Sequence, residues 1–337
     1  MKAKRKTDIF LLAAGITLLA AGAVFLLFVG GALGAIGAAV CFLPAIPLLL
    51  FCFYSKNRGS LRVFAPIFLW PMLAAFAVGF VWPFLQGLYL SFFRFKTLRF
   101  TAFTGFDNYR AALSDPSFLY SFGFTLLFSA VSVAVINVAA FTVALALTRG
   151  LSGGTFFRTV FFMPNLIGGI VLGYIWKLIL DGVLALRFSS SLALEAKYGF
   201  WGLVIVFAWQ QIGYMMIIYI AGLQNVPHQF IEAARIDGAN SFQILRHITI
   251  PTVMPSITIC TFLSLTGAFK LFDQNLALTA GQPFGKTEML ALNIYNSFYS
   301  STTNMGVGQA KAVIFFLAVV IIALSQLYLT GRREGTR

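Results

Sequence analysis

The chain has 337 residues, of which 59% are hydrophobic and only 10% are charged, and its mean hydropathy is +0.88. Soluble domains carry roughly 25% charged residues, so this composition excludes an ordinary soluble protein and indicates an integral membrane protein. The net charge of +14 does not indicate nucleic-acid binding, because the 24 basic residues lie in short clusters between apolar segments.

The N-terminal apolar segment contains no charged side chain between residues 9 and 55. This segment is too long for one crossing, which needs roughly 20 residues, and four glycines within residues 30–37 indicate a tight return. We therefore expect a two-helix transmembrane hairpin over residues 1–62. The basic start MKAKRK leaves a cleaved signal peptide open, although the apolar run is longer than such peptides have.

Six further segments are apolar enough to cross a membrane as helices: residues 63–92, 120–147, 159–180, 201–222, 252–274 and 308–330. Loops on the side of the N-terminus carry twice as many basic residues as the opposite loops, which places both termini in the cytoplasm by the positive-inside rule. We therefore expect an all-α polytopic membrane protein of about eight transmembrane helices, with six of them in a second domain over residues 63–337.

Residues suited to catalysis or metal binding are scarce. The cysteines lie in apolar stretches without a CxxC pair, and the chain has only two histidines, His228 and His247. A metal or catalytic centre needs several such groups close together. We therefore expect no metal site and no enzymatic activity.

One stretch, AGQPFGKT at 280–287, fits the relaxed spelling of a phosphate-binding loop. A phosphate loop needs a strand before it, a helix start after it and backbone N–H groups that converge on the anion, and Pro283 removes one of those donors. The stretch also falls between the seventh and eighth expected spans, on the outer side. We therefore expect no nucleotide at this position.

The longest cytoplasmic loop, NVPHQFIEAARIDGANSFQILRHITIP at 225–251, has an organised pattern. Pro227, after Asn225 as a cap, predicts a short helix that reaches Asp237. Gly238 permits a turn, Asn240 or Ser241 can cap the next helix, and Pro251 marks the entry to the next span.

This loop resembles the EAA loop of binding-protein-dependent ABC importer permeases. The match consists of Glu232-Ala233-Ala234, three residues, Gly238, nine residues, Ile248, and then Ile250-Pro251, where leucine is commoner than Ile250. The stretches GFDNYRAAL, FFRTVFFMPNLI and LTAGQPFGKTEMLALNIY are similar to the carbohydrate-uptake permeases of the maltose and multiple-sugar type. The resemblance covers about residues 62–335, and the first two spans lie outside it.

The resemblance implies the transmembrane domain of a type I ABC importer in the inner membrane of a prokaryote, with a sugar or oligosaccharide as cargo. It implies two separate ATP-binding subunits that hold ATP and Mg, a second related but different permease, and an extracytoplasmic solute-binding protein, with no cofactor bound by this chain. Residues of the loop implied to couple to the ATPase are Glu232, Ala233, Ala234, Arg235, Asp237, Gly238, Ala239, Ile248 and Pro251. An ordinary interfacial amphipathic helix is the alternative for this loop.

A path for an uncharged sugar needs amide and hydroxyl groups together with aromatic faces inside the helix bundle. The candidates at membrane depth are Asn137, Asn165, Gln210, Gln211, Tyr214, Phe269, Phe272 and Gln274. Hydrogen bonding between helices is the alternative use for each. Lys270 and Asp273, three residues apart, are expected to pair with each other.

Other functions remain open at this point. The same type of permease could carry a nucleoside or another polar solute. An ion-coupled secondary transporter needs a carboxylate deep in a span, and a membrane enzyme needs a cluster of histidine and carboxylate groups. The sequence favours neither of the last two, because its ten acidic residues lie outside the middle of the spans.

Overall fold

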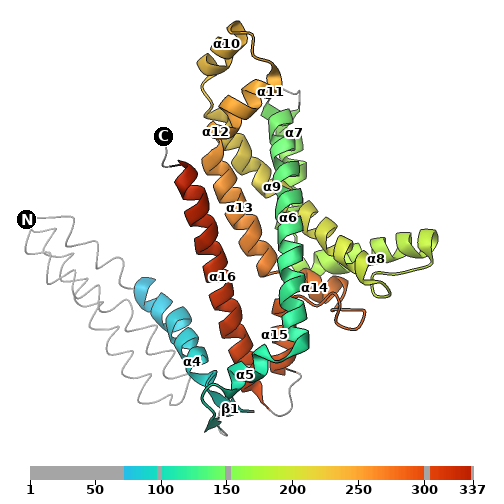
Figure 1. Ribbon diagram of the computed structural model, residues 1–337. Coiled ribbons are helices and arrows are strands. Elements are labelled where there is room, and N and C mark those ends of the chain that lie inside the picture. Colours follow the sequence, from blue (N-terminus) through green and yellow to red (C-terminus); the bar gives the residue numbers. More distant parts are fainter. Residues whose placement is uncertain (1–71, 97–100, 149–152, 300–303, 335–337) are drawn as a thin grey trace, which may run out of the picture. The chain divides into compact units, whose positions relative to one another are not determined.

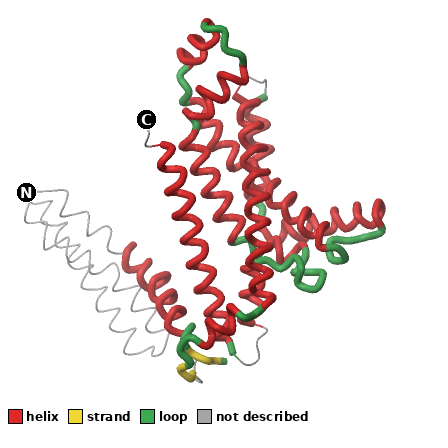
Figure 2. Tube along the Cα trace, viewed as in Figure 1, coloured by secondary structure: helices red, strands yellow, loops and turns green. Residues whose placement is uncertain are grey.

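The computed structural model describes residues 72–96, 101–148, 153–299 and 304–334, and it divides the chain into two units, residues 1–89 and 90–337. The expected hairpin over residues 1–62 lies outside the described residues. Figures 1 and 2 show that the described part is built almost entirely from helices, with one short pair of strands.

The described part of the first unit is residues 72–89, which belong to one apolar helical segment, Met72–Leu90. It contains the π-helical turn η1 (Ala77–Val81) followed by α4 (Trp82–Leu90). Phe76, Phe80 and Phe84 are spaced four residues apart and their rings stack in sequence along one face of the helix. Most of the large apolar side chains of this helix are exposed, as expected for a helix whose surroundings are lipid or other helices.

Four long helices form the bundle of the second unit: α6 (Pro116–Thr148), α9 (Ala196–Gln224), α13 (Met254–Phe269) and α16 (Met305–Glu334). Helix α6 packs along α9, and α13 packs against α6, α9 and α16. Helix α9 is buried on several sides, with Phe207, Met216 and Tyr219 in the core. Its apolar residues are therefore not confined to one stripe, which is typical of a central helix.

Shorter elements connect and flank the bundle. They are α5 (Asp107–Leu113), α7 (Gly154–Phe162), η2 (Met163–Leu166), α8 (Gly169–Phe188), α10 (His228–Ile236), α11 (Ser241–Ile244), η3 (Leu245–Thr249), α12 (Ile250–Thr252), α14 (Asp273–Leu278) and α15 (Leu290–Tyr299). Strands β1 (Phe93–Phe95) and β2 (Thr101–Phe103) pair antiparallel, with Arg94 opposite Ala102.

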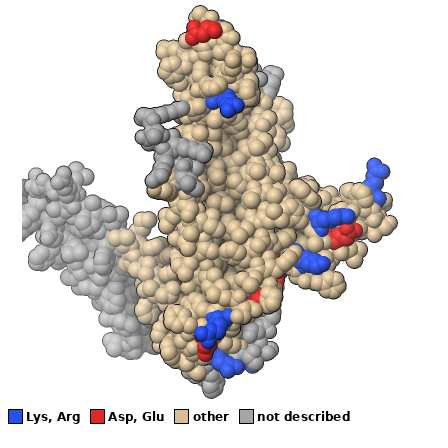
Figure 3. All heavy atoms as spheres, viewed as in Figure 1, with Lys and Arg blue, Asp and Glu red and all other residues tan. Residues whose placement is uncertain are grey.

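The two ends of the bundle carry different elements (Figure 1). Helices α10 and α11 lie at one end, whereas α5, α15 and the strand pair lie at the opposite end. In Figure 3 the visible charged side chains lie toward these ends and on the side of α8, and the face of the bundle between them is apolar or neutral. Apart from the charges beside α8, this arrangement is typical of a membrane protein with its charges at the two water interfaces.

The described residues contain five helices long and apolar enough to cross a membrane, or six if the bent pair Ser241–Thr252 and Met254–Phe269 counts as one span. Three predicted spans, 120–147, 201–222 and 308–330, are confirmed as parts of α6, α9 and α16. The total of eight spans and the cytoplasmic termini stay predictions.

Two predicted spans are interrupted. The span predicted over 159–180 ends at Phe162, because Pro164 lies in a 3₁₀ turn and Ile167 is extended, so a new helix begins at Gly169. The span predicted over 252–274 ends at Phe269, and α14 begins separately at Asp273.

One close approach shows how tightly the interrupted segment packs. A Cβ atom on Gly213 of α9 would lie 1.8 Å from the backbone oxygen of Phe161 in α7. Only glycine allows the two backbones to lie this close, and small residues at helix contacts serve this purpose in membranes.

Candidate functional site

Helix α10 and the turn after it form the centre of the predicted cytoplasmic loop. The helix begins after Pro227, whose extended backbone makes it the N-cap residue. The expectation that Asn225 caps this helix is wrong, because Asn225 terminates α9 instead. Proline fits here because it lacks an N–H group, and the first N–H groups of a helix have no partner within it.

The end of α10 explains the spacing between the EAA residues and the glycine. The backbone N–H of Ala239 donates to the Ala234 oxygen at 2.9 Å, and that of Gly238 donates to the Arg235 oxygen at 3.1 Å. This pair of bonds is a Schellman motif, which requires a left-handed residue, and Gly238 has φ +80°. The predicted turn at Gly238 is confirmed, and the glycine is required by backbone conformation, since no atom lies within 4 Å of its Cβ position.

The next helix, α11, begins with a complete capping box. The Asn240 side chain accepts from the Gln243 N–H at 2.9 Å, and the Gln243 side chain accepts from the Asn240 N–H at 2.7 Å. The prediction of a cap at Asn240 is therefore confirmed. The chain continues without a break through η3 and α12, and Pro251 is the second residue of α12.

The surface of α10 is open. None of its residues is buried, and Glu232, Ala233 and Asp237 are exposed. Exposed apolar side chains accompany them, with Ile236 87% and Phe230 60% accessible. An apolar patch with small residues and charges at its edge is the kind of surface that binds another protein.

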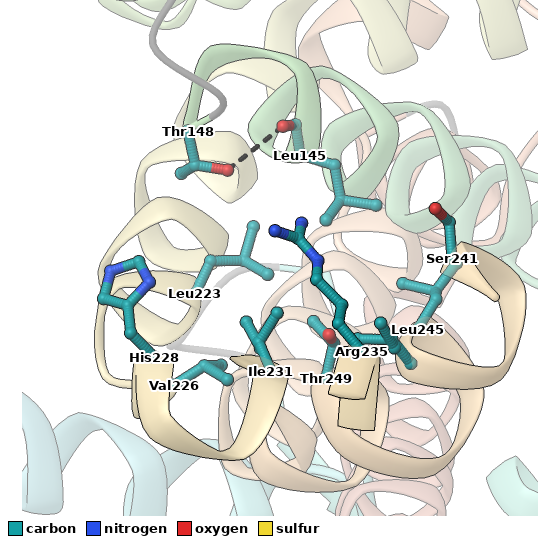
Figure 4. Close-up of a pocket in the computed structure, with 11 residues that line it drawn as sticks. Leu145, Thr148, Leu223, Val226, His228, Ile231, Arg235, Ser241, Leu245 and Thr249 are labelled. Carbon is teal, nitrogen blue, oxygen red and sulfur yellow. Dashed lines mark hydrogen bonds between the residues drawn. The ribbon is translucent and has the colours of Figure 1, made fainter. Parts of the chain in front are cut away.

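A cavity of about 460 Å³ separates α10 from the ends of α6 and α9. Figure 4 shows that the Arg235 guanidinium points across this cavity toward Leu145 of α6. Ile231 of α10 and Ile248 of η3 are half-buried and pack against the core. Helix α10 is therefore held to the bundle through Ile231 and through its covalent connections to α9 and α11.

The first group of path candidates is hydrogen-bonded between helices, with Gln210 and Gln274 buried and Asn137 half-buried. Asn137 of α6 accepts from the Tyr219 hydroxyl of α9 at 2.7 Å and donates to the Ser264 hydroxyl of α13 at 3.0 Å. Gln274 of α14 donates to the Gln210 side chain of α9 at 2.5 Å, and Gln210 donates to the Ile167 oxygen at 3.0 Å.

The remaining path candidates differ in accessibility. Phe269 lies in the core at 2% exposure, whereas Tyr214 is 38% exposed on α9. Gln211, Asn165 and Phe272 are half-buried, and the Phe272 ring lies 5.1 Å from the Tyr295 ring. The structure thus brings Asn165, Gln210 and Gln274 together and leaves Asn137 in a separate cluster.

The sequence of this chain matches known transport proteins. Residues 140–334 match the family described as binding-protein-dependent transport system inner membrane component. The probable starch degradation products transport system permease protein AmyD of Thermoanaerobacterium thermosulfurigenes is 41% identical over 275 residues, which cover 80% of this chain and 94% of AmyD. This chain belongs to that family.

A second relative and a solved structure agree with this assignment. The multiple sugar-binding transport system permease protein MsmF of Streptococcus mutans is 31% identical over 74% of this chain and 89% of its own length. A chain from the crystal structure of a bacterial ABC transporter involved in the import of the acidic polysaccharide alginate superposes with a TM-score of 0.70 at 17% identity, covering 85% of this chain and 99% of that chain. The permease therefore has the fold of an ABC importer transmembrane domain.

The expected pairing of Lys270 with Asp273 in this permease is wrong. Within the described residues the ion pairs are Lys197 with Glu195 and Lys311 with Asp115. The spacing rule for helices does not apply to Lys270 and Asp273, because Lys270 follows the last residue of α13 and Asp273 begins α14.

The AGQPFGKT stretch of the permease does not have the local structure of a phosphate loop. It follows a helix, α14, rather than a strand. Three of its backbone N–H groups donate within the loop, from Gln282 to Thr279, from Lys286 to Pro283 and from Thr287 to Gly281. These donors are engaged by the loop itself and do not converge on a common point for an anion.

Three polar residues of the permease were not predicted as site residues. Tyr219 and Ser264 complete the Asn137 cluster, and Lys311 is buried near the start of α16. Lys311 lies inside the predicted span 308–330, and a lysine within a span is itself a signal of a specific partner. Tyr219 and Ser264 carry no comparable signal, since hydroxyl groups are common in transmembrane helices.

Proposed function

We propose that this chain is the transmembrane permease subunit of an ATP-driven importer for a sugar or oligosaccharide, and that the loop 225–251 couples it to a separate ATPase. The observation that carries the coupling proposal is the open surface of α10, with no buried residue, presented beyond the end of the bundle. The small side chains of Ala233 and Ala234 allow a partner surface to approach the helix closely.

The connections of α10 support a route for mechanical coupling. Because α10 is separated from α6 by a cavity, a push on α10 passes through the chain into α11, η3 and α12. These elements meet α13 at a bend of 70°. Helix α13 carries Ser264, which is bonded to Asn137, so its movement acts directly on the Asn137 cluster.

The coupling residues have distinct roles in this proposal. Gly238 and Ala239 form the turn that ends α10, and Ile248 with Pro251 belongs to the segment that transmits the displacement to α13. The exposed charges of Glu232, Arg235 and Asp237 orient the ATPase surface, because complementary charges fix the register of an interface.

The path candidates are also assigned two kinds of role. Gln211, Tyr214, Asn165 and Phe272 are accessible, so their amide, hydroxyl and aromatic groups can contact a passing solute. Gln210, Gln274 and Phe269 are buried, and Asn137 is half-buried with its amide bonded between three helices, so these four residues hold the walls of the path in position.

The names of two relatives support a sugar or oligosaccharide as the cargo. AmyD is named for the transport of starch degradation products, and MsmF is named for a multiple sugar-binding transport system. A second candidate cargo is another polar solute. The sn-glycerol-3-phosphate transport system permease protein UgpA of Brucella abortus is 30% identical over 71% of this chain and 84% of its own length. Membership of a binding-protein-dependent family gives no support to ion-coupled secondary transport.

The proposed assembly contains two ATP-binding subunits with ATP and Mg, a second permease of related but different sequence, and an extracytoplasmic binding protein in the inner membrane of a prokaryote. A structural neighbour with a TM-score of 0.68 and 18% identity belongs to an alginate ABC transporter solved in complex with a pentasaccharide-bound periplasmic protein. That neighbour supports the expectation of a binding protein for this chain.

The test is purification of the tagged chain without crosslinking, identification of the proteins that accompany it, and a ligand screen on the binding protein. We expect an ATPase to co-purify and Ala233→Trp to remove it, since a large side chain on α10 blocks close approach. Leu113→Trp in α5, a 55% exposed position at the opposite end, is the matched control and should retain the ATPase. Retention of the ATPase by Ala233→Trp, or ATP-independent uptake by the chain alone, contradicts the proposal.

A further inference from the structure

Lys311 of α16 is a buried cation near the end of the bundle opposite α10. Its side chain is only 3% exposed. Removing an ammonium group from water is costly, so a lysine stays at such a position only when its environment supplies oxygen atoms.

Three separate oxygen atoms surround the Lys311 ammonium. Its Nζ atom donates to Asp115 Oδ2 at 2.6 Å, to Ser297 Oγ at 2.7 Å and to Asn293 Oδ1 at 3.1 Å. An ammonium has three hydrogen atoms to donate, so its donors are fully used. The Phe118 ring centroid, 5.3 Å from Nζ, covers the group further.

These contacts join three segments that are far apart in sequence. Asp115 lies directly before α6, Asn293 and Ser297 lie on α15, and Lys311 lies on α16. Ser117 closes the connection, because its backbone N–H donates to Asp115 Oδ1 at 2.9 Å and its hydroxyl accepts from Asn293 at 3.0 Å. The polar groups therefore form a closed ring around the helix ends.

The ring extends to a buried carboxylate. Glu288, 8% exposed, accepts from Asn293 at 2.9 Å and from Asn296 at 2.6 Å. Glu288 ends the loop 279–288, and the Tyr120 hydroxyl of α6 donates to the Lys286 oxygen of the same loop at 3.1 Å. One lysine thus connects α6, α15, α16 and this loop through continuous hydrogen bonds.

We propose that Lys311 is a positioning residue that makes the start of α6, α15, the start of α16 and the loop 279–288 move as one rigid block. This inference rests on the proposed function, in which α13, packed against α6 and α16, is displaced during each ATP cycle. If the hydrogen bonds of this block are lost, the displacement of α13 moves the elements of the block relative to one another. ATP is then hydrolysed without a matching change in the side of the membrane to which the path opens. Without the Lys311 ammonium, the carboxylate of Asp115 loses its bonded cation, and that of Glu288 loses the cation to which Asn293 connects it.

The first test measures uptake and ATP hydrolysis together in proteoliposomes that contain the co-purified complex, for Lys311→Met, Lys311→Arg and the control Lys286→Met. Lys286 is an exposed lysine of the same loop, so its variant loses the same charge without opening the ring. We expect Lys311→Met to lower the ratio of solute transported to ATP hydrolysed by about fivefold or more, the lower range of coupling between sites. Lys311→Arg should recover part of the ratio, and Lys286→Met should leave it unchanged.

The second test reports on the block itself. Met289 is fully buried beside the ring, so a Met289→Cys probe should react slowly with a soluble maleimide in the parent chain and several-fold faster in the Lys311→Met background. If Lys311→Met does not assemble, Asp115→Asn and Ser297→Ala each remove one contact and are measured in the same way.

The outcomes separate this inference from the proposed function. An unchanged ratio, together with a Met289→Cys probe that stays protected in the variants, overturns the positioning role. A purely structural role would lower uptake and hydrolysis in parallel and leave the ratio intact, which also overturns it. Uptake by the parent complex that does not depend on ATP overturns the proposed function and leaves the probe result to be judged by itself.

Discussion

The Tyr219 hydroxyl of α9 donates a hydrogen bond of 2.7 Å to Asn137 of α6. Asn137 in turn donates to Ser264 of α13, so one amide joins the three central helices of the second unit. Tyr219 is 1% exposed, and its hydroxyl therefore has no access to water as an alternative partner. This contact makes the register between α6, α9 and α13 depend on hydrogen bonding as well as on packing.

Tyr219→Phe should destabilise the permease by about 1 kcal/mol, a typical value for an interhelical hydrogen bond in a membrane. The substitution keeps the ring and leaves the Asn137 oxygen without its donor. Thermal unfolding in detergent measures the effect. Tyr214→Phe on the same helix is the control. This tyrosine is 38% exposed, so removal of its hydroxyl group should leave the unfolding temperature unchanged. Equal stability of the two variants would show that the bond contributes nothing.

Gly238→Ala should reduce solute-stimulated ATP hydrolysis through its backbone strain, and Gly238→Asp should abolish it because it adds a negative charge at an exposed position of the proposed interface, while membrane insertion stays intact. The φ angle of +80° costs an alanine roughly 1–2 kcal/mol, so the turn after α10 relaxes to another conformation. Gly238→Asn is the matched control, since asparagine adopts the left-handed region more readily. The assay is ATPase activity of the assembled complex with its binding protein. Full stimulation in Gly238→Asp would contradict the role of the loop.

Gly213→Ala should lower the unfolding temperature of the permease, because its methyl group would lie 1.8 Å from the Phe161 oxygen. The backbone of α7 must move away, and overpacking of this kind costs about 1–3 kcal/mol or more. Gly182→Ala in α8 is the control, since no atom lies within 4 Å of its Cβ position. That variant should gain roughly 0.5–1 kcal/mol in helix stability, because alanine suits a helix interior better than glycine. Similar unfolding temperatures for both variants would refute the packing argument.

The sequence predicted the parts of the fold that depend on local chemistry. Gly238 and Asn240 are a helix-ending glycine and a helix cap, and both signals depend only on neighbours within a few residues. The break at Pro164 has a local cause as well, but an apolar run hides it, since length and hydropathy alone do not show where a helix stops.

Contacts between segments that are far apart in the chain could not be predicted from the sequence. Nothing near Lys311 indicates that Asp115, 196 residues away, is its partner. The separation of Lys270 from Asp273 by a helix end likewise depends on the tertiary path of the chain. The candidate path residues were selected by type and depth, and their division into buried and accessible groups required the structure.

Tyr214→Ala and Gln211→Ala should raise the KM for solute uptake while the unfolding temperature changes little, because both residues are accessible on α9. Gln210→Ala should lower the unfolding temperature, since it leaves Gln274 of α14 without its buried partner. Uptake by proteoliposomes at varied binding-protein and solute concentrations gives the KM, and unfolding is measured on the same preparations. An unchanged KM in the first two variants, with lowered stability, would assign those residues to helix packing instead.

Asp115 should make the stability of the permease depend on acid pH. Burial alone raises the pKa of this carboxyl, but the hydrogen bond and charge of Lys311, with the backbone N–H groups of Ser117 and Phe118, outweigh burial and lower it. A carboxylate whose pKa is lower in the folded state stabilises the fold above its unfolded pKa of about 3.9, and this contribution is lost as the pH falls through the folded value. The unfolding temperature of the parent should therefore fall more steeply below about pH 4 than that of Asp115→Asn, which lacks the titrating group. Parallel curves for the two proteins would show that the bond with Lys311 does not depend on the charge of Asp115.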